Sequence, residues 1–134
     1  MSDLVSQDLN MIFKTPKGET VHALKDVSFT LKKGELLTVL GPSGCGKTTL
    51  LNIAAGFLRP TSGSIVLGGN EINGPGVERG MVFQQGALFE WLTVAENVDF
   101  GLRMKKEDPI KTAKKVDEWL EICLLYTSDA ADDP

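Results

Sequence analysis

The stretch "VLGPSGCGKTTLLNIAAGF", Val39 to Phe57, decides the fold of this chain. Within it, "GPSGCGKT" at 41–48 matches the phosphate-loop pattern G-x-x-x-x-G-K-[ST] at every fixed position. The apolar run at 36–40 predicts a strand buried on both faces before the loop. From Lys47 onward, apolar residues recur at helical spacing, which predicts a helix that Gly56 ends. A strand, a glycine-rich turn and a helix in this order indicate a phosphate-binding loop.

The residue types of this loop fit that chemistry. Its glycines let several backbone N–H groups point inward around phosphate oxygens, and the helix N-terminus behind them attracts anions. Lys47 supplies an ammonium group for the outer phosphates, and the Thr48 hydroxyl suits Mg²⁺. We interpret Cys45 as a small filler residue rather than a reactive thiol. The predicted phosphate-binding residues are Gly41, Pro42, Ser43, Gly44, Cys45, Gly46, Lys47, Thr48 and Thr49.

Length and composition place the loop in one globular domain. The chain has 134 residues, of which 42% are hydrophobic, and this suffices for a core. A net charge of −4 argues against nucleic acid as a partner. We find no signal-peptide pattern and no apolar run long enough for a membrane helix. Two cysteines are too few for a disulfide framework, so we expect a cytosolic chain.

The segments on either side of the loop predict further strands and helices. Before it, alternation at 9–13 predicts a strand, "TPKG" at 15–18 a turn, and 24–31 a second strand. After it, "SIVLGGNEI" at 64–72 predicts a hairpin and "GMVFQ" at 80–84 a short strand. Thr93 and Glu96 form a capping box that opens a helix, and Asp108-Pro109 opens another. The residues predicted to line the buried side of the last helix are Ile110, Ala113, Val116 and Leu120.

These motifs together resemble the ATP-binding subunits of ABC transporters. The resemblance covers residues 8–122 and is strongest in "KKGELLTVLGPSGCGKTTLLNIAAGFLRPTSG" at 32–63. "GPGVERGMVFQ", followed by "W…TV.ENV.FGL", is similar to the importer branch for taurine, nitrate and aliphatic sulfonates. The resemblance implies the N-terminal half of an α/β P-loop NTPase. Such a half has a mixed sheet with an antiparallel β subdomain and the start of a helical region.

The resemblance also implies roles outside the phosphate loop. Phe13 resembles the aromatic residue that stacks on adenine, and Gln84 resembles the Q-loop glutamine that reaches Mg²⁺ together with Thr48. The stretch after Gln84 resembles the surface that receives the membrane subunit, and Glu90 stands where relatives often have proline. The predicted docking residues are Gln85, Phe89, Glu90 and Trp91. Ordinary structural roles, such as core aromatics and a solvated strand end, remain the alternatives.

As a member of this family, the chain would use ATP and Mg²⁺ and hydrolyse ATP to drive uptake of taurine, a sulfonate, nitrate or a similar solute. Its implied partners are transmembrane permease subunits, a second copy of itself and, indirectly, a periplasmic or extracellular substrate-binding protein. It would lie in the cytoplasm, on the inner face of the membrane. Two alternatives stay open: a nucleotide-binding module without turnover, and a P-loop nucleotide kinase.

The C-terminal part of the sequence departs from the family pattern. We find no signature motif after Gln84, no strand ending in Asp-Glu and no switch histidine, so no catalytic set is complete. We therefore expect residues 1–122 to be a partial, inactive ATP-binding domain in which the strand at 36–40 lacks neighbours. "CLLYTSDAADDP" at 123–134 resembles the translation of a transposon-type sequencing adapter, and we interpret it as a non-native tail.

Overall fold

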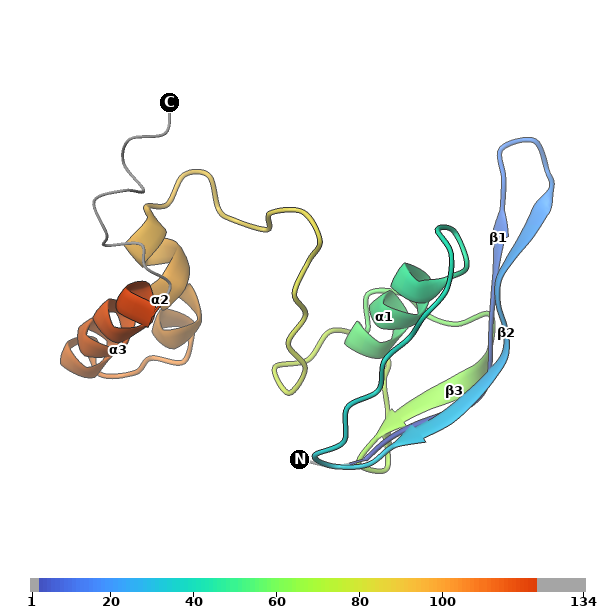
Figure 1. The fold of residues 1–134 in the computed structure, drawn as a ribbon, viewed down its shortest axis with the longest axis horizontal. Helices are drawn as coiled ribbons and strands as arrows, with labels where there is room; N and C mark the ends of the chain where they lie inside the picture. Colours follow the sequence, from blue (N-terminus) through green and yellow to red (C-terminus); the bar gives the residue numbers. More distant parts are fainter. Residues whose placement is uncertain (1–2, 123–134) are drawn as a thin grey trace. The chain divides into compact units, whose positions relative to one another are not determined.

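The computed structural model describes residues 3–122. The chain divides into two compact units, Met1–Val82 and Phe83–Pro134, and each is described by itself (Figure 1). The predicted tail at 123–134 lies outside the described residues. Among residues 3–122, no helix combines the length and the apolar character needed to cross a bilayer.

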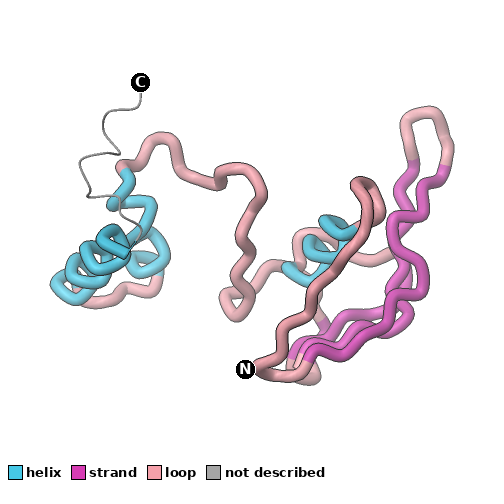
Figure 2. The backbone as a smooth tube through the Cα atoms, in the orientation of Figure 1, coloured by secondary structure: helices cyan, strands magenta, loops and turns pink. Residues whose placement is uncertain are grey.

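The first unit is built on an antiparallel sheet. Its strands are β1 (Leu4–Lys14), β2 (Thr20–Leu31), β3 (Ser62–Leu67) and β4 (Asn70–Glu71). They lie in the order β2-β1-β3-β4, and every neighbouring pair is antiparallel. Figure 2 draws the strands of this unit in magenta. The predicted strands around 9–13 and 24–31 and the hairpin at 64–72 are therefore confirmed. The turn at 15–18 also forms, with the Gly18 N–H donating to the Thr15 carbonyl at 2.9 Å.

Helix α1 (Lys47–Ala55) packs against this sheet and completes the core of the first unit. Leu50 and Ile53 of α1 are buried with apolar residues of the strands, as their helical spacing predicts. The helix ends at Gly56, whose φ of 86° is left-handed. A Cβ at this position would also collide with the carbonyl of Gly74. The buried core consists of Leu9, Met11, Leu24, Leu50, Ile53, Ile65 and Ile72.

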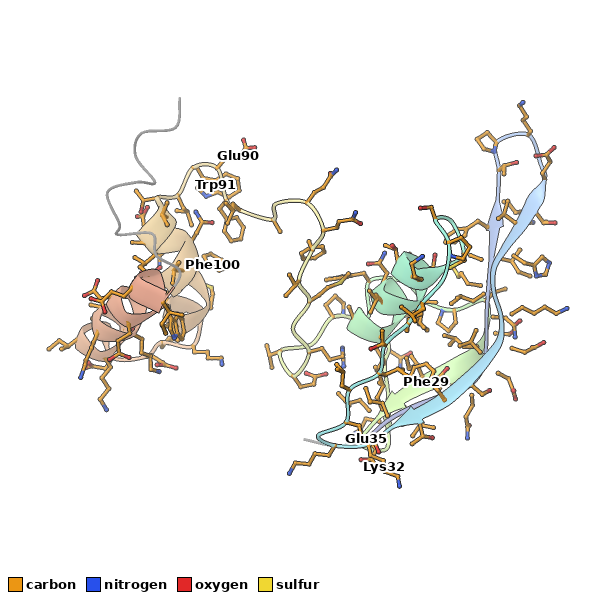
Figure 3. All side chains as sticks on the ribbon, in the orientation of Figure 1. Phe29, Lys32, Glu35, Glu90, Trp91 and Phe100 are labelled. Carbon is orange, nitrogen blue, oxygen red and sulfur yellow. The ribbon has the colours of Figure 1, made fainter. Side chains whose placement is uncertain are left out.

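Two predicted strands do not form, and both corrections have the same cause. After β2, Lys32 and Glu35 close a turn (Figure 3), and residues 36–40 then continue as loop. Leu36 is 92% exposed, and residues 80–84 likewise lack regular structure. A strand exists only when a neighbour pairs with its backbone, and neither segment has one among the described residues. The described sheet is consequently antiparallel rather than mixed.

The second unit contains two packed helices. Helix α2 (Val94–Met104) begins at the predicted capping box, and α3 (Pro109–Ile122) begins with proline at its first position. Leu102 of α2 and the Thr112, Val116 and Leu120 side chains of α3 are buried. The buried stripe of α3 is therefore displaced from the predicted one. Ile110 and Ala113 are exposed, because the face that meets α2 starts at Thr112.

Candidate functional site

The phosphate loop is fixed on the sheet through its last glycine. Gly46 has a φ of 93° and stands at the N-cap of α1. A Cβ at this position would collide with the backbone carbonyl of Ala23 on β2, and it would lie 3.0 Å from a methyl carbon of Leu24. Only glycine tolerates both the left-handed conformation and this close approach. The contact sets where α1 starts relative to β2.

The N-terminus of α1 is left without a capping side chain. Gly46 offers no side-chain cap, and the first turn contains no acidic residue. Leu50 N–H is the first to bond within the helix, to the Gly46 carbonyl at 2.9 Å. Within residues 3–122, the N–H groups of Lys47, Thr48 and Thr49 have no hydrogen-bond acceptor. These three donors and the helix dipole form a site that fits an anion such as a phosphate group.

Lys47 is folded back over the loop. Its ammonium nitrogen donates to the carbonyls of Gly41 at 2.6 Å and Pro42 at 2.7 Å, and it lies 3.5 Å from the Cys45 sulfur. Because two carbonyls hold the ammonium group, its charge stays within the loop. The loop residues 41–49 are thus brought together around one cation and one helix N-terminus.

Phe13 lies on the hairpin that supports this loop. On β1 it pairs with Val21 of β2, two residues before the Ala23 carbonyl that Gly46 approaches. Phe13 is 38% exposed. An exposed aromatic face is what stacking on a base requires.

A second hollow in the first unit lies away from the loop. It measures ≈ 920 Å³ and is lined in part by Leu51, Ala54 and Ala55 of α1, but by no residue of 41–49. Arg79 is also among its lining residues, and its guanidinium pairs with the Glu78 carboxylate and donates to the Gly74 carbonyl. We assign this hollow no part in phosphate binding.

The predicted metal ligands are polar rather than acidic. Thr48 and Gln84 are both exposed, Thr48 in the first unit and Gln84 in the second. Within the described residues there is no group of three or more His, Cys, Asp or Glu side chains that could hold a metal ion. Hydroxyl and amide oxygens are donors that Mg²⁺ accepts.

The predicted docking residues form part of an aromatic cluster in the second unit. The Phe89 ring lies 5.3 Å from the Trp91 ring and 4.5 Å from the Phe100 ring of α2, measured between centroids. Figure 3 shows Glu90 and Trp91 in the segment before α2 and Phe100 on the helix. Trp91 is 78% exposed, whereas Phe89 is half-buried. Gln85 and Glu90 are exposed, so three of the four residues are accessible.

Asn97 organises this segment and was not predicted. Its side-chain amide accepts from the Phe89 N–H at 2.8 Å and donates to the carbonyls of Phe89, Leu92 and Thr93 at 3.0–3.1 Å. The amide therefore fastens the aromatic segment to the first turn of α2. The residue lies within the "ENV" of the quoted motif, but hydrogen bonding over eight positions leaves no periodic signal in a sequence.

A shallow apolar groove follows from this arrangement. It measures ≈ 510 Å³ and lies entirely within the second unit. The residues that line it are Leu88, Phe89, Glu90, Leu92, Val94, Asn97 and Val98. Two of the four predicted docking residues, Phe89 and Glu90, are among them.

Comparisons with known proteins identify the family of the chain. Residues 24–131 match the family described as "ABC transporter". The "Taurine import ATP-binding protein TauB" of Pelagibacter ubique (strain HTCC1062) is 91% identical over 122 residues. The protein of the same name from Roseobacter denitrificans (strain ATCC 33942 / OCh 114) is 60% identical over 122 residues. Each alignment covers 91% of this chain and 46% of the relative, so the chain spans about half the length of these relatives.

Solved structures give the same assignment. The chain is similar to the ATP-binding cassette MJ0796 in a dimeric post-hydrolysis state bound to ADP and Pi, with a TM-score of 0.76 and 30% identity. A second dimeric structure of MJ0796, described as a bacterial ABC transporter cassette, gives a TM-score of 0.77 and 30% identity. Both similarities cover 88% of this chain and 56% of the other. The fold is thus that of an ABC ATPase cassette, and the chain belongs to the ABC transporter family.

Proposed function

We propose that this chain binds MgATP through residues 41–49, as the ATP-binding part of an importer for taurine or a similar small solute. The observation that carries the proposal is the uncapped N-terminus of α1, where the N–H groups of residues 47–49 have no capping side chain. The close approach of Gly46 to β2 fixes the position of this N-terminus. The names of its relatives supply taurine as the solute. Sulfonates and nitrate remain candidates of the same class.

Each part of the site has a task in this proposal. The N–H groups at the start of α1 and the Lys47 ammonium bind the phosphates, and Phe13 stacks on the adenine. The Thr48 hydroxyl and the Gln84 amide oxygen are each ligands of the kind that Mg²⁺ accepts. When bound, Mg²⁺ neutralises the phosphate charge that develops during hydrolysis. Lys47 and the loop N–H groups stabilise the same charge.

The full transport cycle belongs to a larger assembly. Two copies would enclose two ATP molecules, and hydrolysis would be a property of that dimer. The dimeric structures of MJ0796 support this arrangement. The segment 85–91 and the groove beside it would receive the permease subunits at the cytoplasmic face of the membrane, and a substrate-binding protein would deliver the solute to those subunits.

The two alternatives, a nucleotide kinase and a binding module without turnover, can be distinguished from an ATPase. A nucleotide kinase needs arginines for its acceptor, but the three arginines of this chain have structural partners. Arg59 and Arg79 donate to backbone carbonyls, and Arg103 pairs with Asp99. A module that binds nucleotide without turnover stays consistent with the same loop. Measurement of ADP release from a preparation competent to dimerise would distinguish that module from an ATPase.

Calorimetric titration of the 134-residue chain with MgATP tests the proposal. We expect saturable binding, and Lys47→Ala should weaken it by about ten- to a hundredfold, since a hydrogen bond to a charged group contributes about 1.5–3 kcal/mol. Lys25→Ala is the matched control, because it removes an exposed lysine on β2. Equal affinity of the Lys47 and Lys25 variants would contradict the proposal.

A further inference from the structure

The corner between α2 and α3 concentrates positive charge in an otherwise acidic chain. Residues 103–115 contain six basic and two acidic side chains, which gives this segment a net charge of +4 against −4 for the whole chain. Two of the basic residues have ion-pair partners: Arg103 binds Asp99 at 2.7 Å, and Lys115 binds Glu107 at 2.6 Å. The remaining four are exposed and have no ion pair within residues 3–122. They are Lys105, Lys106, Lys111 and Lys114, which we call the corner lysines.

The backbone gives the corner a defined shape. Lys106 adopts a left-handed φ of 55°, and the Glu107 N–H bonds to the Leu102 carbonyl at 3.2 Å, which ends α2. Asp108 then caps α3, because its carboxylate accepts from the N–H groups of Ile110 and Lys111 at 3.1 Å. Hydrogen bonding to Lys115, and then the nearby charges of Lys115, Lys105 and Lys111, lower the pKa of Glu107. Lys115 of α3 donates to the Glu107 carboxylate at 2.6 Å.

The charge order along α3 is the reverse of what the helix dipole favours. Its N-terminal half carries three lysines, at 111, 114 and 115, and its C-terminal half carries Asp117, Glu118 and Glu121. Cations are stabilising at a helix C-terminus and unfavourable at an N-terminus. Lys105 and Lys106, at the end of α2, are explained by the dipole of that helix. The dipole of α3 does not explain Lys111 and Lys114.

Apolar side chains accompany the corner lysines. Met104 at the end of α2 and Ile110 in the first turn of α3 are exposed, Ile110 by 82%. A solvated charged face would not need them, whereas a phospholipid surface presents both anionic headgroups and an apolar interior. Basic residues next to a membrane each gain binding energy from anionic lipids, and the gain falls off within a Debye length.

We propose that the corner lysines, with Met104 and Ile110, form a docking surface for anionic phospholipid headgroups. The surface would hold this part of the chain against the cytoplasmic leaflet, beside the permease. That location rests on the proposed function, but the binding itself depends only on the corner. The recognised chemistry is a layer of phosphodiester anions rather than a single free phosphate.

Cosedimentation of the complete chain with lipid vesicles tests this surface. We expect it to bind vesicles that contain phosphatidylglycerol and not vesicles of phosphatidylcholine alone, and we expect salt to release it. Replacement of the four corner lysines by glutamine should reduce binding by about tenfold or more. The matched control replaces Lys14, Lys17, Lys25 and Lys33 by glutamine. These four lysines are exposed, and their replacement removes the same total charge. This control should retain binding.

Each contrary result overturns the proposal. Equal binding to both vesicle types would mean that apolar contact alone is responsible, and equal loss in the two lysine sets would mean that only total charge matters. No binding to either vesicle type would leave an anionic protein surface as the partner of the corner. MgATP titration of the glutamine variant is the separate readout. It should match the parent chain, so failure of nucleotide binding and failure of lipid binding are told apart.

Discussion

Helices α1 and α2 begin in opposite ways. At α2, the Thr93 hydroxyl accepts from the Glu96 N–H at 3.3 Å, and the Glu96 carboxylate accepts from the Thr93 N–H at 2.8 Å. At α1, the corresponding positions are Gly46 and Thr49, and neither supplies a cap. Both helices face the same physical problem of unpaired N–H groups. Helix α2 pairs these groups with its own side chains, whereas α1 leaves them available to an external anion.

The comparison separates stability from function. A capping box contributes to the free energy of unfolding and excludes ligands, because the dipole is already neutralised by a carboxylate. An uncapped N-terminus forgoes that stabilisation. The conformation at the start of α1 is instead imposed by the contact between Gly46 and β2.

The largest effect is expected from Gly46→Ala. A left-handed alanine costs about 1–2 kcal/mol and overpacking adds about 1–3 kcal/mol, so we expect a loss of about 3 kcal/mol in unfolding free energy and of MgATP binding. Gly44→Ala is the control, because Gly44 has a similar φ of 80° but no atom within 4 Å of an added Cβ. Chemical denaturation followed by circular dichroism measures both. Equal losses would mean that the contact with Ala23 does not hold the loop.

The next effect comes from giving α1 the acidic residue that α2 has. Thr49→Glu places a carboxylate three residues after the N-cap, as Glu96 is placed in α2. We expect the helix to gain about 0.3–1 kcal/mol from its dipole while MgATP affinity falls more than tenfold through repulsion of the phosphates. Calorimetry compares it with Thr49→Gln, which has the same shape without the charge. If the two variants bind MgATP equally, phosphates do not approach this N-terminus.

A smaller effect is expected at α2 itself. Thr93→Ala removes the N-cap hydroxyl and should cost about 1 kcal/mol. Faster hydrogen exchange at the Glu96 amide would report it, because this N–H donates to the Thr93 hydroxyl. Thr93→Ser keeps the hydroxyl and should exchange as the parent does. Unchanged exchange in the alanine variant would show that the box does not stabilise α2.

Local signals predicted the helices well. The capping box at Thr93 and Glu96, the proline at the start of α3 and the glycine at the end of α1 all lie within a few residues of the ends that they mark. The glycine-rich loop was predicted for the same reason. Its support by Ala23 was not, because that contact joins a backbone carbonyl of β2 to a loop more than twenty positions later.

Features that depend on distant partners could not be predicted. The apolar runs at 36–40 and 80–84 have strand composition, but composition does not say whether another strand pairs with them. Ile110 has the right spacing for a buried face, and only the packing of α3 on α2 selects Thr112, Val116 and Leu120 instead. The Asn97 amide likewise acts on a segment outside its own helix.

The smallest expected effect is a difference in pH dependence between the N-terminus of α2 and the N-terminus of α1. Hydrogen bonds from the Thr93 N–H and hydroxyl, with a lesser contribution from Arg103, hold the pKa of Glu96 below its ordinary value of 4.5. A carboxyl whose pKa is lower in the folded state than in the unfolded state stabilises the fold at pH values above its unfolded-state pKa. That stabilisation is lost as the pH falls through the folded-state pKa.

Hydrogen exchange at the start of α2 should therefore accelerate, relative to the intrinsic rate, as pH falls from 7 to below 4.5, whereas the start of α1 should not change. Glu107, whose pKa is also lowered, acts in the same direction at the corner between α2 and α3. Glu107→Gln removes that contribution, and Glu96→Gln in addition should abolish the pH dependence at α2. If it persists in the double variant, Glu96 is not its source, and the contrast between the two helix N-termini would not extend to electrostatics.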